Sequence, residues 1–157
     1  EAYWLFGFDF EKIDVVIQPQ SIIHSLVQFV DGSIKAQIGT PDMRLPIQYA
    51  LSYPQRYNNS FVRTEFPKIK QLTFFEPDME KYKCLKLAFE SIKTGGTTPC
   101  ILNAANEIAV EKFLNKEISF IQIPDLIETA LNKIENHTSP NLNTIFECDA
   151  QTRELLK

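Results

Sequence analysis

The sequence predicts an α+β protein in which a β-hairpin with short sheet segments comes first and a small helical bundle follows. Apolar and polar residues alternate on either side of Asp31-Gly32, which is a strong hairpin signal. From about residue 80 the apolar spacing changes to that of amphipathic helices, interrupted by Pro and Gly. With 44% hydrophobic and 23% charged residues, the 157-residue chain can bury a core of its own.

The predicted hairpin joins the segments SIIHSLVQFV and SIKAQIG through Asp31-Gly32. This dipeptide favours a two-residue turn, and such a turn fixes which residues face each other. It would place His24 on the wetter face of the hairpin, opposite Gly39, where a missing side chain leaves room for a ligand. The other face would be core-like and would carry Ile23, Val27, Phe29, Ile34, Ala36 and Ile38.

Short elements surround the hairpin. The segments DVVI, before Pro19, and QLTFFEP, at 71–77, are strand candidates. LPIQYALSY predicts a short helix that ends at Pro54, and residues 55–70 form a polar connection.

The second half predicts helices with short connections, as in a small bundle. MEKYKCLKLAFESIK is amphipathic and ends at Gly95-Gly96. Thr98 is the expected N-cap of PCILNAANEIAVEKFLNK, with Pro99 at the first helical position. PDLIETALNKIEN predicts a further helix, and Asp149 is the expected cap of a last short helix, AQTRELLK.

Composition argues against several functional classes. The formal net charge is −4 and the 16 basic residues are scattered, which argues against a nucleic-acid surface. No apolar run approaches the roughly 20 residues needed to span a bilayer, and the N-terminal residues lack the features of a signal peptide. The chain also lacks a starting Met, so we expect it to be a piece of a longer protein.

The cysteines and histidines are too dispersed for a disulfide framework or a histidine metal site. Cys84, Cys100 and Cys148 are odd in number and widely spaced, which is typical of free thiols in a reducing compartment. His24 and His137 are the only histidines and lie far apart in the sequence.

Two neighbouring segments carry candidate site residues, and each has a structural alternative. His24, with Ser21 before it, could bind an anionic ligand or be an ordinary half-exposed strand residue. Met43 in the corner PDMR could pad a flat ring or fill the gap between hairpin and helix. Arg44 could bind an anion or pair with Asp42. Spacing alone leaves these alternatives open.

A third segment, NAANE, places Asn103, Asn106 and Glu107 on one helix face. Asn is a poor helix former, so two of them in mid-helix need a reason. Buried hydrogen bonds between helices are the expected reason, and ligand contact is the alternative. The sequence contains no Gly-rich phosphate loop, no Ser/His/Asp arrangement and no carboxylate cluster suited to a metal.

The segments PQSIIHS, FVDGS, AQIGTPDMRLPI, CLKLAFE and LNAANEIAV, in this order and spacing, resemble the 1-deoxy-D-xylulose 5-phosphate (DXP) reductoisomerase family. The resemblance covers essentially the whole chain and implies the C-terminal part of such an enzyme. It implies conversion of DXP to 2-C-methyl-D-erythritol 4-phosphate by metal-assisted rearrangement and NADPH-dependent reduction, in the methylerythritol phosphate route to isoprenoids. NADPH and a divalent metal, Mg or Mn, are the implied cofactors, and the sugar phosphate is the implied substrate.

The resemblance also implies roles for individual residues. Ser21 and His24 match positions at the margin of the family's active site, and Pro41 and Met43 match the corner beside nicotinamide and substrate. Gln18 departs from the pattern, because the family usually has histidine there.

The resemblance further implies a domain division. Residues 1–70 would be the C-terminal part of the α/β catalytic and dimerisation domain, and residues 71–157 a linker strand with the helical bundle domain. The catalytic residues and metal ligands are expected upstream, so no residue here is assigned to a metal. Glu1 is accordingly not a metal ligand, and Trp4 is not the tryptophan of the family's mobile loop.

The implied protein is a homodimer joined through the hairpin sheet, located in the cytoplasm of a bacterium or in a plastid-type organelle of a eukaryote. No nucleic-acid or membrane partner is expected. The chain by itself is expected to be inactive and to self-associate. The rival interpretation is a stand-alone, non-catalytic dimerisation module.

Overall fold

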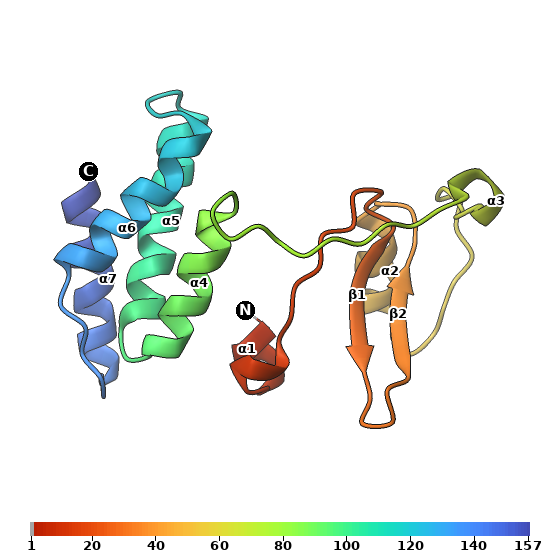
Figure 1. Ribbon diagram of the computed structural model, residues 1–157, viewed down its shortest axis with the longest axis horizontal. Coiled ribbons are helices and arrows are strands. Elements are labelled where there is room, and N and C mark those ends of the chain that lie inside the picture. The colour runs from red at the N-terminus through yellow and green to blue at the C-terminus, as the bar shows by residue number, and fades with distance from the viewer. Residues whose placement is uncertain (1) are drawn as a thin grey trace. The chain divides into compact units, whose positions relative to one another are not determined.

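The structure is a computed structural model that describes residues 2–157, so Glu1 lies outside the described residues. These residues divide into two compact units: a helical unit made of residues 2–14 and 78–157, and a hairpin unit made of residues 15–77. A two-stranded antiparallel sheet is followed by a set of helices, which confirms the α+β class (Figure 1). The domain boundary expected at residue 70 falls before this division, and the domain roles stay a prediction.

The hairpin unit contains one sheet and two short helices. Its elements are β1 (Ile23–Gln28), β2 (Ile34–Ile38), α2 (Arg44–Ser52) and α3 (Phe66–Ile69). The strand candidates at 14–17 and 71–77 meet in a single antiparallel bridge. In this bridge the Ile17 N–H donates to the Phe75 carbonyl at 2.9 Å, and the Phe75 N–H donates to the Ile17 carbonyl at 3.0 Å.

The turn between β1 and β2 has three residues, so the predicted two-residue turn is wrong. The Phe29 N–H donates to the Ser33 carbonyl at 2.9 Å, which leaves residues 30–32 as the loop. Gly32 takes a φ of +83°, a conformation that glycine adopts without steric cost. The Asp31 carboxylate accepts the Ser33 N–H at 2.9 Å and fixes the end of the loop.

This change moves the pairing by one residue and redistributes the side chains between the two faces. Val27 now faces Lys35, so the core-like face expected from Ile23, Val27, Phe29, Ile34, Ala36 and Ile38 does not form. The strand side chains are largely exposed, with Val27 at 51% and Ile34 at 59% of their full accessible area. The hairpin unit therefore has apolar strand residues without a core to bury them within the described residues.

The expected pairing of His24 with Gly39 is also wrong. The register is irregular between Ile23 and Ser25, where His24 lies, and the Gly39 N–H donates to the Ile22 carbonyl at 2.9 Å. An extra residue of this kind is a β-bulge, which re-aims the side chains beside it.

The helical unit packs its helices around α5, which contacts α4, α6 and α7 (Figure 1). Its elements are α1 (Ala2–Phe6), η1 (Phe10–Lys12), α4 (Lys83–Thr94), α5 (Thr98–Leu114), η2 (Phe120–Gln122), α6 (Ile123–Lys133) and α7 (Leu142–Leu156). The core cluster consists of Ile101, Ala105, Ala109, Ile123, Ile127, Ala130, Cys148 and Leu156. The small alanines of α5 and α6 allow close helix approach. Among the described helices, none is long and apolar enough to cross a membrane.

The starts of α5 and α7 differ from the sequence prediction. Thr97, not Thr98, is the N-cap residue of α5, and the Thr98 hydroxyl instead donates to the Ser91 carbonyl at 2.8 Å. Helix α7 begins at Leu142, where the Asn141 side chain accepts the Thr144 N–H at 2.9 Å. Asp149 therefore lies inside α7 and caps nothing. The end of α4 agrees with the prediction, because Gly95 is its C-cap with φ +70°.

Candidate functional site

A groove of about 870 Å³ lies in the hairpin unit, along the open end of the hairpin, the corner at 39–43 and the start of α2. It gathers all four residues that the sequence places at a substrate or cofactor margin, namely Ser21, His24, Pro41 and Met43. These residues are separated in the sequence by the whole hairpin, and the hairpin's return strand brings them together. We therefore take this groove as the candidate site.

Ser21 and His24 reach the groove from the entrance to β1. Ser21 has a φ of +52°, in the left-handed region that residues with a Cβ rarely adopt. His24 lies at the register irregularity of β1 and is exposed. At this bulge the strand departs from regular pairing, and the His24 side chain lines the groove.

Gln18 organises the main chain before this strand. Its side-chain Oε1 accepts the Ile22 N–H at 2.7 Å and the Ile23 N–H at 3.3 Å. Its backbone carbonyl accepts the Ser21 N–H at 3.0 Å. The residue that departs from the family pattern thus has a defined structural role here.

The corner beside the groove carries an ion pair. The Arg44 Nε donates to Asp42 Oδ1 at 2.9 Å and its Nη2 to Oδ2 at 2.6 Å, so both carboxylate oxygens are engaged. These hydrogen bonds hold the pKa of Asp42 below its ordinary value and raise the pKa of Arg44. The guanidinium also lies 4.7 Å from the centre of the Phe61 ring. Of the two alternatives for Arg44, the structure has the pair with Asp42.

Met43 is next to this pair and projects from the corner. Its side chain is 71% exposed and lines the groove, so it does not fill a gap between hairpin and helix. An exposed thioether on a turn bounded by Pro41 and Pro46 offers a polarisable apolar surface to a flat ring.

Sequence reasoning missed three further residues that line the groove, Tyr49, Tyr53 and Arg56. The two tyrosine rings are 5.7 Å apart, and the Arg56 guanidinium lies 3.8 Å from the centre of the Tyr49 ring. Arg56 thus brings a positive charge to a mostly apolar groove. The four-residue spacing of the tyrosines was the available signal, because it brings Tyr49 of α2 and Tyr53, the C-cap residue of α2, to the same side of the helix.

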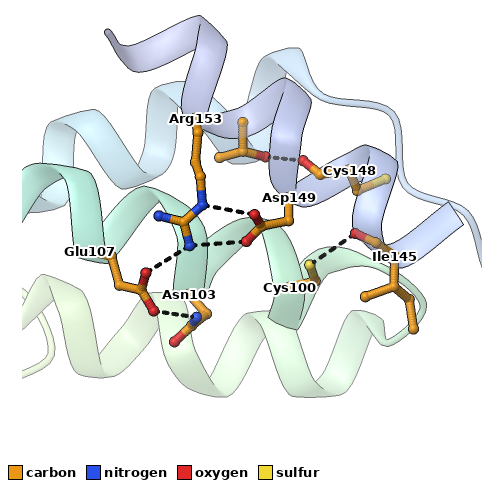
Figure 2. A network of polar contacts seen from close by, with 8 residues as sticks. Cys100, Asn103, Glu107, Ile145, Cys148, Asp149 and Arg153 are labelled. Carbon is orange, nitrogen blue, oxygen red and sulfur yellow. Dashed lines mark hydrogen bonds and ion pairs between the residues drawn. The ribbon is translucent and has the colours of Figure 1, made fainter. Parts of the chain in front are cut away.

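The NAANE segment lies in the helical unit, apart from the groove, and takes part in a polar network between α5 and α7 (Figure 2). The Asn103 Nδ2 donates to Glu107 Oε1 at 3.0 Å, and Arg153 Nη2 donates to Glu107 Oε2 at 2.6 Å. Arg153 also bonds Asp149, with Nε to Oδ2 at 2.7 Å. The prediction of buried hydrogen bonds between helices is wrong for Asn103, because its bond lies within α5; Glu107 makes the bond to α7, and both side chains are exposed. Asn106 is half-buried on the same helix.

Charge pairing sets the protonation states in this network. The hydrogen bonds from Arg153 and Asn103 hold the pKa of Glu107 below its ordinary value. The hydrogen bonds to Asp149 and Glu107 raise the pKa of Arg153. Glu107 and Arg153 therefore stay charged at neutral pH, and one guanidinium joins the two helices.

Residues 2–157 contain no group of three or more His, Cys, Asp or Glu side chains placed to hold a metal ion. The groove itself offers His24 and Asp42 as possible ligands, and both oxygens of Asp42 already bind Arg44. The residues present therefore fit an apolar ring and an anion better than a metal.

Comparison with known proteins places the chain in a family. Residues 38–155 match the family model described as the DXP reductoisomerase C-terminal domain. The chain belongs to the DXP reductoisomerase family. The resemblance read from the sequence motifs is thereby confirmed.

Curated DXP reductoisomerases are similar to nearly the whole chain. The enzyme of Chloroherpeton thalassium is 50% identical over 153 residues, which are 98% of this chain and 40% of that protein. The enzyme of Bacteroides fragilis is 50% identical over 157 residues, which are 100% of this chain and 40% of that protein. The chain thus spans about 40% of the length of the curated relatives it matches.

Solved DXP reductoisomerase structures share the fold. The enzyme from Zymomonas mobilis in complex with NADPH has a TM-score of 0.86 and 43% identity, over 99% of this chain and 41% of that one. A reductoisomerase in complex with NADPH, fosmidomycin and magnesium has a TM-score of 0.87 and 37% identity, over 99% of this chain and 40% of that one.

Proposed function

We propose that the chain is the C-terminal part of an enzyme that converts DXP to 2-C-methyl-D-erythritol 4-phosphate by metal-assisted rearrangement and NADPH-dependent reduction. The observation that carries the proposal is the family match over residues 38–155, together with 50% identity to curated enzymes of this activity. The groove that gathers Ser21, His24, Pro41 and Met43 supports it from the structural side.

In this proposal the chain supplies one margin of the active site. The Ser21 hydroxyl and the His24 imidazole offer hydrogen bonds to a polar substrate, and Arg56 attracts its negative charge. Pro41 and Met43 form an apolar pad against the flat nicotinamide and keep water from that side. Bound NADPH supplies the hydride for the reduction.

The proposed cofactors are NADPH and a divalent metal, Mg or Mn. The groove's apolar lining fits a nicotinamide ring, whereas residues 2–157 lack a ligand cluster for the metal. We assign the metal ligands and the catalytic residues to the parts of the enzyme that the relatives have beyond these residues.

The same proposal assigns residues 1–70, with the hairpin, to the catalytic and dimerisation domain and residues 71–157, with the linker strand and the bundle, to a supporting C-terminal domain. The exposed apolar residues of β1 and β2 support a homodimer joined through the hairpin sheet, because unpartnered strand surfaces of this kind favour association. A stand-alone dimerisation module rests on the same surface and is the second candidate. The bacterial relatives support a cytoplasmic location.

A chimeric enzyme tests the proposal. Residues 1–157 replace the matching C-terminal part of the Chloroherpeton thalassium enzyme, and NADPH oxidation is measured with DXP as substrate. We expect turnover by the chimera and none by the 157-residue chain alone. A well-folded, dimeric chimera without turnover would refute the catalytic proposal and favour the dimerisation module. Turnover by the chain alone would refute the assignment of the catalytic residues and metal ligands to other parts of the enzyme.

The two methionines of the chain provide a matched pair of variants in that chimera. Met43→Ala removes the pad in the groove, whereas Met79→Ala removes a methionine outside it. Because a thioether–ring contact contributes about 0.3–1.5 kcal/mol, Met43→Ala should raise KM for NADPH by up to about tenfold. Met79→Ala should leave KM for NADPH unchanged. Equal effects of both variants would remove Met43 from the proposed nicotinamide margin.

A further inference from the structure

We propose that Gln18 is a positioning residue of the groove, which holds Ser21 and His24 in place through the main chain that joins them. Its effect on turnover rests on the function proposed above. Its effect on the groove rests on the hydrogen bonds of the hairpin unit alone, so the two can be tested separately.

Gln18 binds three consecutive main-chain N–H groups. Its backbone carbonyl accepts from Ser21 at 3.0 Å, and its side-chain Oε1 accepts from Ile22 at 2.7 Å and Ile23 at 3.3 Å. Gln18 alone thus accepts the main-chain N–H groups of all three residues that connect the turn at 18–21 to the first strand. The bonds of the Ser21 and Ile22 N–H groups flank the Ser21 Cα, and we infer that they hold its left-handed φ of +52°.

The Gln18 side chain is itself held by a relay. Its Nε2 donates to Gln20 Oε1, and Gln20 Nε2 donates to Thr73 Oγ1 at 2.8 Å. Gln20 Oε1 also accepts the Thr73 N–H at 3.2 Å. This relay fixes which end of the Gln18 amide faces the main chain, because only its oxygen can accept the N–H groups of Ile22 and Ile23.

Two further contacts tie this arrangement to the groove. The bridge between Ile17 and Phe75 anchors the chain immediately before Gln18. The Ile22 carbonyl accepts the Gly39 N–H at 2.9 Å, and Gly39 lines the groove as well. A displacement of residues 21–23 would therefore be passed on to Gly39 and to the groove lining.

The primary amide of Gln18 serves as an acceptor toward the main chain and as a donor toward Gln20. Methionine has a similar length and neither function. Glutamate keeps the acceptor oxygen and loses the donor toward Gln20. The variants Gln18→Met and Gln18→Glu thus separate the two duties, and Gln71→Met, at an exposed glutamine outside the groove, is the matched control.

The first experiment follows the 157-residue chain by NMR. The chain has two histidines, so the His24 ring reports on the groove and the His137 ring, in the helical unit, is an internal reference. In Gln18→Met we expect the Ile22 and Ile23 amides to exchange with solvent about tenfold faster, as for the loss of a hydrogen bond. We expect the His24 ring signals to shift while those of His137 stay, and Gln18→Glu to retain most of the amide protection.

The second experiment measures kcat and KM for DXP in the chimeric enzyme with the same variants. Gln18→Met should lower kcat/KM about tenfold relative to the unsubstituted chimera, whereas Gln18→Glu should retain most of the kcat/KM of that chimera. Gln71→Met should have the same kcat/KM as the unsubstituted chimera. Unchanged amide exchange and His24 signals in Gln18→Met would overturn the proposal. If Gln18→Met changes the amide exchange of Ile22 and Ile23 but leaves kcat/KM unchanged, Gln18 has a purely structural role. That result would also overturn the proposal.

The two proposals fail in different ways. If the parent chimera and Gln71→Met both lack turnover, the proposed function fails, and the His24 signals still decide whether Gln18 positions the groove. If Gln18→Met loses the His137 reference signals, its fold is disturbed, and Gln18→Glu then carries the comparison. A Gln18→Glu variant with the same loss of amide protection and kcat/KM as Gln18→Met would contradict the acceptor role.

Discussion

Gly96→Ala should destabilise the helical unit far more than an alanine at a glycine of the same conformation. Gly96 has a φ of +65°, and a Cβ there would lie 2.4 Å from the His137 carbonyl oxygen and 2.5 Å from Asn136 Oδ1. Gly7 in the same unit has a φ of +64°, and a Cβ there would meet nothing within 4 Å. The pair therefore separates backbone strain from steric contact.

The structure gives the size of the effect. An alanine in the left-handed region costs about 1–2 kcal/mol at either position. At position 96 the loop at 136–137 must also move, and its hydrogen bonds to Thr97 include three with a main-chain N–H donor. The Thr97 N–H donates to Asn136 Oδ1 at 2.9 Å and to the His137 carbonyl at 3.1 Å, and the His137 N–H donates to Thr97 Oγ1 at 3.0 Å. Loss of these three bonds adds roughly 0.5–1.5 kcal/mol each, so the total loss at position 96 is about 2.5–6.5 kcal/mol.

Urea unfolding followed by far-ultraviolet circular dichroism measures this loss, because the helices of this unit dominate the signal. The wild type, Gly96→Ala and Gly7→Ala are compared as free energies of unfolding from linear extrapolation. Values for the two variants within about 1 kcal/mol of each other would refute the role assigned to the contact with the loop.

Three further predictions concern both units. Asn141→Ala removes the cap of α7 and should lower the free energy of unfolding by about 1 kcal/mol, with Asn143→Ala as the control in the same turn; equal losses would contradict the cap. Glu107→Gln should flatten the pH dependence of stability: the lowered pKa of Glu107 stabilises the fold above the ordinary carboxyl range, and this contribution is lost as the pH falls through that lowered value, from about pH 5 downward. Chemical unfolding across this pH range measures the effect, with Glu147→Gln at an exposed position as the control. A pH dependence of the free energy of unfolding that is the same for Glu107→Gln and the wild type would refute the prediction. Val27→Lys on the exposed strand should reduce self-association of the chain in light scattering toward its mass of 18.1 kDa, whereas Val62→Lys, outside the strands, should not; an unchanged mass in Val27→Lys would count against the hairpin as the interface.

Local signals in the sequence predicted which elements form. The helix breaks at Gly95 and Pro54 and the change of apolar period near residue 80 act within a few residues, so they are legible without a structure. The motifs that identified the family are equally local. The same reasoning failed at Asn141, because Asp149 and Asn141 are both acceptable caps and only the packing of α7 on α5 decides how far the helix extends.

The register of the hairpin shows the limit of pattern reasoning. Asp31-Gly32 predicted a turn correctly, but the choice between two and three loop residues was set by the Asp31 side chain, which accepts the Ser33 N–H, and by the φ of Gly32. A difference of one residue changes the face on which every strand side chain lies. His24 kept its place beside the groove only because a bulge follows Ile23.

By itself, the sequence determined the α+β class, the positions of the turns and helix breaks and the family, because these depend on neighbours along the chain. Tertiary structure decided which distant side chains meet. Gln20 reaches Thr73 across 53 residues and Arg153 reaches Glu107 across 46. Hydrogen bonds of this kind depend on donor and acceptor geometry to within a few tenths of an ångström, and no spacing along the chain specifies that geometry.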